Sequence, residues 1–286
     1  MTSPDISPVP PGPGAQTSRA GRDLPVAIGS GLVLIALIAG SLYLWKPAFM
    51  LVVVAAILIG VWEFKQGFAA KQIRLPSEPL YVGAVVMLVS AYVGGAPALV
   101  TALAVTALAT MLWRLRGGVD GFVRDTTAAV FVAVYVPFLA GFSLLLLRAE
   151  DGQLRVLTFI LVTIASDIGG FAVGVLVGKH PMAPVISPKK SWEGFAGSTV
   201  FCIAAGWATV VYFLDGDWWV GVLLGVVTVV MATLGDLCES VIKRDLGIKD
   251  MSSVIPGHGG LMDRLDSLLA TVAPIWLLLF YLVPVS

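Results

Sequence analysis

The sequence predicts an all-α fold: a polytopic integral membrane helical bundle with about nine transmembrane helices. Composition is the first observation, because 58% of the 286 residues are hydrophobic, 13% are charged, and the mean hydropathy is +0.93. The apolar residues form long runs, many of them close to the roughly 20 residues that cross a bilayer as a helix. The basic residues gather in alternate loops between these runs, as they do in membrane proteins. These observations together exclude a soluble globular domain.

The first segment of the chain has a different composition. Residues 1–23 are rich in Pro, Ser and Gly and show no apolar periodicity. Such a composition cannot bury a core, so we expect a disordered cytoplasmic tail. No basic start leads directly into an apolar stretch, which argues against a cleavable signal peptide.

Nine apolar runs follow this tail. Breaks at Lys46–Pro47 and at Gly94–Pro97 predict tight helical hairpins, because Gly and Pro interrupt helices. Polar residues at membrane depth concentrate after residue 160, so we expect a transmembrane scaffold at 24–150 and a transmembrane catalytic region at 151–286. The runs cover residues 25–45, 48–64, 79–94, 97–113, 126–147, 155–178, 194–214, 218–238 and 267–284.

The distribution of charge predicts the orientation. With nine spans, fifteen of the eighteen basic residues fall on the side that carries the N-terminal tail, and three, Lys46, Arg148 and Arg155, fall on the other. The positive-inside rule then places the N-terminus and both polar motifs described below in the cytoplasm. We therefore expect a multi-pass protein of the cell membrane whose site faces the cytoplasm. The net charge of zero gives no overall field that would favour nucleic acid as a partner.

A dense polar segment lies between the last two apolar runs, from Ser240 to Asp266. Asp263 and Asp266 are three residues apart, so in a helix both carboxylates project from one face. Glycines just before them let backbone N–H groups approach a phosphate at a helix N-terminus. Carboxylate oxygens suit Mg²⁺, which binds through one or two carboxylates plus substrate phosphates. A solvated basic and acidic loop is the alternative interpretation.

The run at 218–238 ends in polar residues that extend this pattern. Asp236, Ser240 and Lys243 are spaced by four and seven residues, which places them on one helix face. They predict a carboxylate, a hydroxyl and an ammonium group at one end of the helix. Ordinary polarity at the end of a span is the alternative.

A second polar segment runs from Ser166 to Gly194. Asp167 lies within an apolar run, where an ionisable group is costly and usually faces a polar cavity, although a packing carboxylate bonded to its own helix is the alternative. Lys189 and Lys190 are loop cations that suit phosphates of a substrate or, alternatively, of lipid headgroups. Ser191 precedes an apolar run and is placed to cap its helix, and a phosphate can bind at the same N-terminus.

Both segments resemble the signature stretches of the phosphatidate cytidylyltransferase (CDP-diacylglycerol synthase) family. The residues that carry the resemblance are Ser240, Lys243–Arg244, Lys249–Asp250, His258–Gly259–Gly260, Asp263–Arg264 and Asp266, with Ser187 to Gly194 in the second stretch. The resemblance covers about 155–270. It departs from the family pattern at Gly169–Gly170–Phe171, where a small residue and a tyrosine are expected.

The resemblance implies transfer of CMP from CTP to phosphatidate, which gives CDP-diacylglycerol and pyrophosphate for phospholipid biosynthesis in the lipid bilayer. We expect Asp236, Asp263 and Asp266 to be catalytic and to bind one or two Mg²⁺ ions, with Lys243 as a further catalytic residue. We favour His258 as a phosphate hydrogen-bond donor or a loop-shaping residue over a general base, because a phosphate monoester is already anionic. The expected substrate-binding residues are Lys189, Lys190, Ser191, Ser240, Arg244, His258, Gly259, Gly260 and Arg264.

Two other functions are compatible with parts of this pattern. A CTP-dependent kinase of a polyprenol or other lipid would also need Mg²⁺ and a lipid groove. An ion-coupled secondary transporter would use intramembrane carboxylates, but transporters often show repeated halves, and this chain has a one-sided polar cluster. A homodimer is one assembly that the sequence allows.

Overall fold

The structure is a computed structural model that describes residues 24–257 and 259–284, and most of these residues are helical. This confirms the predicted all-α membrane fold. The disordered tail predicted at 1–23 lies outside the described residues. The helices are α1 (Leu24–Leu44), α2 (Lys46–Ala70), α3 (Ser77–Arg114), α4 (Phe122–Ala133), α5 (Leu139–Arg148), α6 (Gly152–Val177), α7 (Trp192–Leu214), α8 (Trp218–Leu246) and α9 (Met262–Leu282). Shorter elements are a 3₁₀ turn (Leu115–Gly117), a π-helical turn (Val134–Phe138) and the strands β1 (Pro181–Ala183) and β2 (Ser187–Ser191).

Seven helices within the described residues are long and apolar enough to cross a membrane, and Gly29–Leu44 is a shorter apolar helix. The chain is thus a multi-pass membrane protein, and the number nine stays a prediction. The longest candidate, Ser77–Gly117, is not straight. It turns at Gly95, whose φ of 76° and ψ of −165° are not helical, and Gly83 then packs directly against Thr106. The helical hairpin predicted from Gly94–Pro97 is therefore confirmed.

The C-terminal helices pack very closely because glycines face one another at their crossings. A Cβ atom at Gly169 of α6 would lie 2.8 Å from the Gly197 carbonyl oxygen of α7. Between α7 and α8, a Cβ atom at Gly221 would lie 2.5 Å from the Gly206 carbonyl oxygen. Small residues allow helix backbones in membranes to approach in this way, where burial from water gives no driving force. The close packing fixes how the polar ends of α6, α7 and α8 meet.

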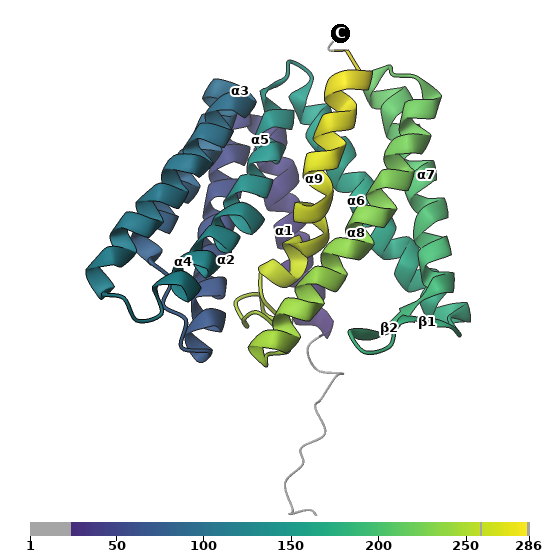
Figure 1. Cartoon of the computed structure of the whole chain (residues 1–286). Coiled ribbons are helices and arrows are strands. Elements are labelled where there is room, and N and C mark those ends of the chain that lie inside the picture. The colour runs from purple at the N-terminus through teal and green to yellow at the C-terminus, as the bar shows by residue number, and fades with distance from the viewer. Residues whose placement is uncertain (1–23, 258, 285–286) are drawn as a thin grey trace, which may run out of the picture.

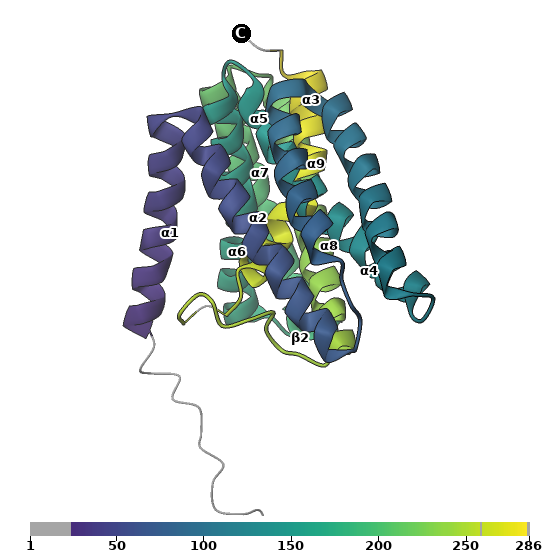
Figure 2. The ribbon, with the colours of Figure 1, turned by 90° about the vertical axis from the view of Figure 1, so that its left-hand side faces the viewer.

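The bundle has two different ends. The start of α1, the β1–β2 hairpin and the segment between α8 and α9 lie at one end, and the C-terminus lies at the other (Figures 1 and 2). The Ser30 hydroxyl donates a hydrogen bond of 3.1 Å to the Pro256 carbonyl, which joins α1 to that segment. We call these the site end and the opposite end. Both predicted polar motifs lie at the site end, and the side of the membrane that this end faces stays a prediction.

Candidate active site

A cavity of about 320 Å³ opens between α6, α7, α8 and the β1–β2 hairpin at the site end. Four of the charged residues singled out in the sequence line it together, although they come from three separate stretches of the chain. These residues are Asp167 of α6, Lys189 and Lys190 of β2, and Asp236 of α8. Apolar side chains, including Phe171 and Phe195, form the rest of the wall. The cavity thus combines both signs of charge with an apolar surface.

Lys190 and Asp236 form an ion pair across this cavity. The Lys190 side chain is 24% exposed and that of Asp236 is 36% exposed, so both groups remain reachable from the cavity. Asp167 lines the same cavity. Two carboxylates, from α6 and α8, therefore face this cavity together with Lys189 and Lys190.

Ser191 forms the junction between the hairpin and α7. Its hydroxyl accepts a hydrogen bond of 3.1 Å from the Gly194 N–H, which confirms the predicted helix cap. The N-terminus of α7, with its positive partial charge, therefore faces the cavity that Ser191 and Gly194 line. Such an N-terminus suits a phosphate.

The hairpin is fastened to its neighbours on both sides. Glu193 accepts hydrogen bonds from the Lys179 and His180 N–H groups at 3.1 and 3.2 Å. Arg244 of α8 donates from Nε to the Ile186 carbonyl at 2.6 Å. Arg244, expected to bind substrate, thus contacts the hairpin that carries the two cavity lysines.

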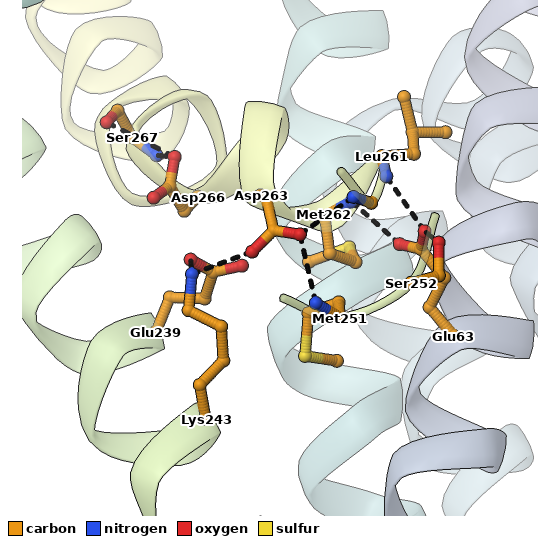
Figure 3. A network of polar contacts seen from close by, with 11 residues as sticks. Glu63, Glu239, Lys243, Met251, Ser252, Leu261, Met262, Asp263, Asp266 and Ser267 are labelled. Carbon is orange, nitrogen blue, oxygen red and sulfur yellow. Dashed lines mark hydrogen bonds and ion pairs between the residues drawn. The ribbon is translucent and has the colours of Figure 1, made fainter. Parts of the chain in front are cut away.

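A second charged cluster lies between α8 and α9 (Figure 3). The Lys243 ammonium group is 2.6 Å from an oxygen of Glu239 and 2.7 Å from one of Asp263. The Lys243 side chain is only 17% exposed, and those of Glu239 and Asp263 are 0% and 6% exposed. Removing one partner of a buried ion pair leaves an uncompensated charge, so these three groups depend on one another.

Asp263 also holds the segment 247–261, which we call the site loop. Its second oxygen accepts hydrogen bonds from the Met251 N–H at 2.9 Å and the Gly260 N–H at 2.8 Å (Figure 3). Gly259, with φ of 86°, pairs with Ile255 through two backbone hydrogen bonds. Gly259 thus has a backbone conformation that favours glycine, and the Gly260 N–H is bonded to Asp263 in this structure. The approach of these N–H groups to a phosphate stays a prediction. His258 lies outside the described residues.

Glu63 of α2 is a site residue that sequence reasoning missed. Its two oxygens accept hydrogen bonds from the N–H groups of Leu261 at 2.8 Å and Met262 at 2.7 Å, where α9 begins, and Ser252 of the site loop also contacts it (Figure 3). Glu63 is fully buried, and an anion there stabilises the helix N-terminus. A signal was present, since Glu63 is the only charged residue in the apolar run 48–64.

Asp266 faces away from the site loop. It is buried, and one of its oxygens accepts a hydrogen bond of 2.7 Å from the Ser267 N–H. Glu239 is fully buried, and one of its oxygens has no hydrogen-bond partner in the part of the chain that the structure describes. An unpartnered buried carboxylate oxygen is costly, and a cation or proton would offset that cost.

The three predicted magnesium ligands do not form one compact set in this structure. Asp236 faces the cavity, Asp263 faces Lys243 and the site loop, and the described residues contain no group of three His, Cys, Asp or Glu side chains close enough to hold a metal. Mg²⁺ needs only one or two protein carboxylates when phosphates supply further oxygens. The carboxylate chemistry therefore fits Mg²⁺, and the ligand set stays a prediction.

The remaining predicted residues occupy the same end of the bundle. Lys189 is exposed at the cavity, Ser240 is half-buried on α8, and Arg264 is exposed on the first turn of α9. Their roles toward a substrate stay predictions.

A model described as the cytidylyltransferase family matches residues 25–282, which is most of the chain. The chain belongs to this family. A relative from Mycobacterium bovis, named phosphatidate cytidylyltransferase, is 41% identical over 284 residues, covering 93% of this chain and 92% of the relative.

Two further relatives with the same name are 38% identical. The Mycobacterium leprae protein is 38% identical and covers 92% of this chain and 89% of its own length. A Staphylococcus aureus protein is 38% identical over 142 residues, which is 49% of this chain. Cytidylyltransferase relatives outside the mycobacteria thus also match this chain, over a shorter part.

Proposed function

We propose that this cytidylyltransferase transfers CMP from CTP to phosphatidate and releases pyrophosphate. The observation that carries the proposal is the cavity at the site end, where lysines, carboxylates and a helix N-terminus meet inside a membrane bundle. The names of the relatives, which match nearly the whole chain, support the same reaction. In this reaction an oxygen of the phosphatidate monoester forms a bond to the α-phosphorus of CTP. The bond from that phosphorus to the bridging oxygen breaks, and its electron pair leaves with pyrophosphate.

Positioning and charge neutralisation are the main tasks of the protein in such a reaction. Lys189 and Lys190 line the cavity and are placed to contact phosphates, with Lys190 exchanging its contact to Asp236 for one to the substrate. The N-terminus of α7 adds backbone N–H groups beside them. We propose that Lys243 acts as a supporting charge, because it forms ion pairs with the buried carboxylates of Glu239 and Asp263.

Magnesium is the cofactor that the carboxylates suit. We propose that Asp236 and Asp266 bind it, with Asp263 as a third ligand, because a carboxylate has about four lone-pair sites and Asp263 uses three of them for Lys243, Met251 and Gly260. When bound, Mg²⁺ would neutralise charge on the phosphates of CTP.

The lipid substrate would enter from the membrane along α6. Phe171 lines the cavity and is 73% exposed, and Ile168, Val175 and Leu176 of the same helix are also exposed. Acyl chains can lie on this apolar surface while the headgroup phosphate reaches Lys189 and Lys190. We also propose that the site end faces the cytoplasm, where CTP is found, in the cell membrane; the asymmetry of basic residues supports this orientation.

The position of the transferred phosphorus tests the reaction. Purified protein is incubated with phosphatidate, Mg²⁺ and CTP labelled at either the α- or the γ-phosphorus. Cytidylyl transfer puts only the α-label into the lipid, a CTP-dependent lipid kinase puts only the γ-label there, and a transporter puts neither. Asp236→Asn should lose the α-label, while Asp217→Asn, a matched exposed aspartate at the opposite end, should keep it. Absence of the α-label from lipid with the parent protein would refute the proposal.

A homodimer is a further proposal on the same protein. Chemical cross-linking in native membranes, followed by mass determination, tests it. If the cross-linked sample contains only species with the mass of one chain, the dimer is contradicted.

A further inference from the structure

A larger cavity, of about 890 Å³, lies at the opposite end of the bundle. It is bounded by the hairpin turn of α3, the end of α5, the start of α6 and the end of α9, so it is separate from the candidate active site (Figure 1). The proposed reaction uses none of its residues. Its wall includes Gly95, Leu145, Arg148, Glu150, Trp276 and Phe280.

Two arginines border this cavity and have different surroundings. Arg155 is buried and fully engaged, since it donates to Asp151 at 2.6 Å and to the Leu279 and Val283 carbonyls, each at 2.9 Å. Arg148 is exposed and has no hydrogen-bond or ion-pair partner among residues 24–257 and 259–284. Arg155 therefore binds carbonyls at the end of α9. Arg148 instead presents a cation to the cavity that forms no ion pair with the described residues.

The position of Arg148 depends on the hairpin turn. A Cβ atom at Gly95 would lie 2.5 Å from Nη1 of Arg148, so the end of the Arg148 side chain lies directly against the turn. The φ of 76° at Gly95 requires glycine. The guanidinium thus lies against the rim formed by α3.

The rest of the cavity is apolar and aromatic. The Trp276 and Phe280 rings of α9 stack with centroids 5.2 Å apart, and Phe280 is 59% exposed. Leu145 and Leu146 form a buried apolar floor. Aromatic side chains typically lie at the level of lipid headgroups, and apolar ones below contact acyl chains. The cavity therefore matches an amphiphile with a charged head and an apolar tail.

The charged residues at the edge of the cavity determine which lipid headgroup fits there. Glu150 lines the same cavity and is exposed, and its carboxylate forms no ion pair within residues 24–257 and 259–284. The Lys46 ammonium group donates a hydrogen bond of 3.1 Å to the backbone carbonyl of Glu150. Because backbone carbonyls hold Lys46, the cavity itself offers the guanidinium of Arg148 and the carboxylate of Glu150, and this combination disfavours a free, doubly charged phosphate. It suits a headgroup with one phosphodiester and one ammonium group.

We propose that this cavity binds one zwitterionic aminophospholipid of the outer part of the bilayer. Its phosphodiester contacts Arg148 through charge-assisted hydrogen bonds, its ammonium group contacts Glu150, and one acyl chain lies along Leu145 and Phe280. The bound lipid joins α3, α5 and α9 at their ends, and it is chemically distinct from the phosphatidate of the proposed reaction.

Native mass spectrometry of the full-length protein tests this site. The protein in detergent is titrated with phosphatidylethanolamine, with phosphatidylglycerol or with inorganic phosphate. The detergent is then removed in the mass spectrometer, and the retained ligands are counted from the mass. We expect one phosphatidylethanolamine to be retained preferentially. Arg148→Ala should weaken its apparent affinity by about ten-fold or more, the size of a lost charge-assisted contact. Lys71→Ala, an exposed cation at the site end, is the matched control and should leave that affinity unchanged.

Each other result would overturn part or all of the proposal. Equal retention by the parent protein and Arg148→Ala would remove Arg148 from a lipid site. Retention of inorganic phosphate with the affinity of the lipid would indicate a simple anion site. Equal affinity for phosphatidylglycerol, with no change in Glu150→Gln, would overturn the selection for an ammonium group. A thermal unfolding scan of each variant without added lipid verifies that the variants are folded, so a loss of binding is not a loss of fold.

Discussion

Replacement of Glu63 by alanine is the sharpest test of how the site is held together. Glu63 belongs to α2, yet its carboxylate accepts hydrogen bonds from the first N–H groups of α9 and contacts Ser252 of the site loop. These contacts fix where α9 begins, and Asp263 lies on its first turn. Glu63→Ala should therefore displace the site loop and Asp263 without removing any residue that we assign to substrate or metal.

The size of the effect follows from the lost contacts. Each hydrogen bond from a neutral N–H group to a charged acceptor contributes about 1.5–3 kcal/mol, and Glu63 accepts two of them in a fully buried position. The local loss is therefore about 3–6 kcal/mol. Because Asp263 still holds Met251 and Gly260, the loop is displaced rather than released. A misplacement of this kind costs on the order of 100-fold in kcat.

Glu63→Gln separates shape from charge. Leu261 and Met262 donate to different oxygens of Glu63, so the single amide oxygen of Gln can accept from only one of them in this geometry. The amide also lacks the negative charge at the helix N-terminus. Its activity should lie between those of the parent protein and Glu63→Ala. Glu78→Ala, at an exposed glutamate in the first turn of α3, is the control and should behave as the parent protein.

Two measurements together decide this prediction. Steady-state kinetics with CTP and phosphatidate give kcat and KM, and hydrogen exchange reports the protection of the amides at 251–262. We expect kcat to fall with faster exchange in that segment and unchanged exchange in α6 and α7. Parent-like kcat and parent-like exchange in Glu63→Ala would refute the reasoning that Glu63 positions the site.

Three further predictions concern other parts of the protein. Asp266→Asn should nearly abolish turnover at saturating Mg²⁺ while the protein still inserts, as a lost metal ligand would; near-normal kcat would remove Asp266 from the metal site. In a variant without native cysteines, Gly257→Cys should react with a membrane-impermeant thiol reagent only from the cytoplasmic side, and labelling of intact cells would contradict the orientation. Deletion of residues 2–22 should leave activity per membrane-inserted protein unchanged, because this segment has no patterned apolar residues; a several-fold loss would show that it contacts the catalytic region.

Features that depend on neighbours in the sequence could be predicted. The hairpin at Gly94–Pro97 and the cap at Ser191 are local, because a turn or cap is decided by residues a few positions apart. The apolar runs likewise predicted the membrane fold, since a span is decided by its own length and composition.

Contacts between distant segments could not be predicted in the same way. Nothing near Glu63 in the sequence indicates that it binds residues 261 and 262, and nothing near Arg244 indicates the Ile186 carbonyl. Such contacts depend on how whole helices pack, and one sequence does not specify that packing by local pattern. The predicted scaffold at 24–150 therefore supplies a carboxylate to the site loop of the catalytic region, a role that the division at residue 150 did not anticipate.

The balance of charge in the buried cluster connects the structure to the magnesium proposal. Glu239, Asp263 and Asp266 carry three potential negative charges, and Lys243 supplies one positive charge among them. Lys190 is already paired with Asp236. Buried charges without partners are costly, and one oxygen of Glu239 has no partner among the described residues. Buried carboxylates in excess of Lys243 suit a divalent ion, which would offset their charge and that of the CTP phosphates. This charge balance supports the proposal that Asp236 and Asp266 bind Mg²⁺, with Asp263 as a third ligand.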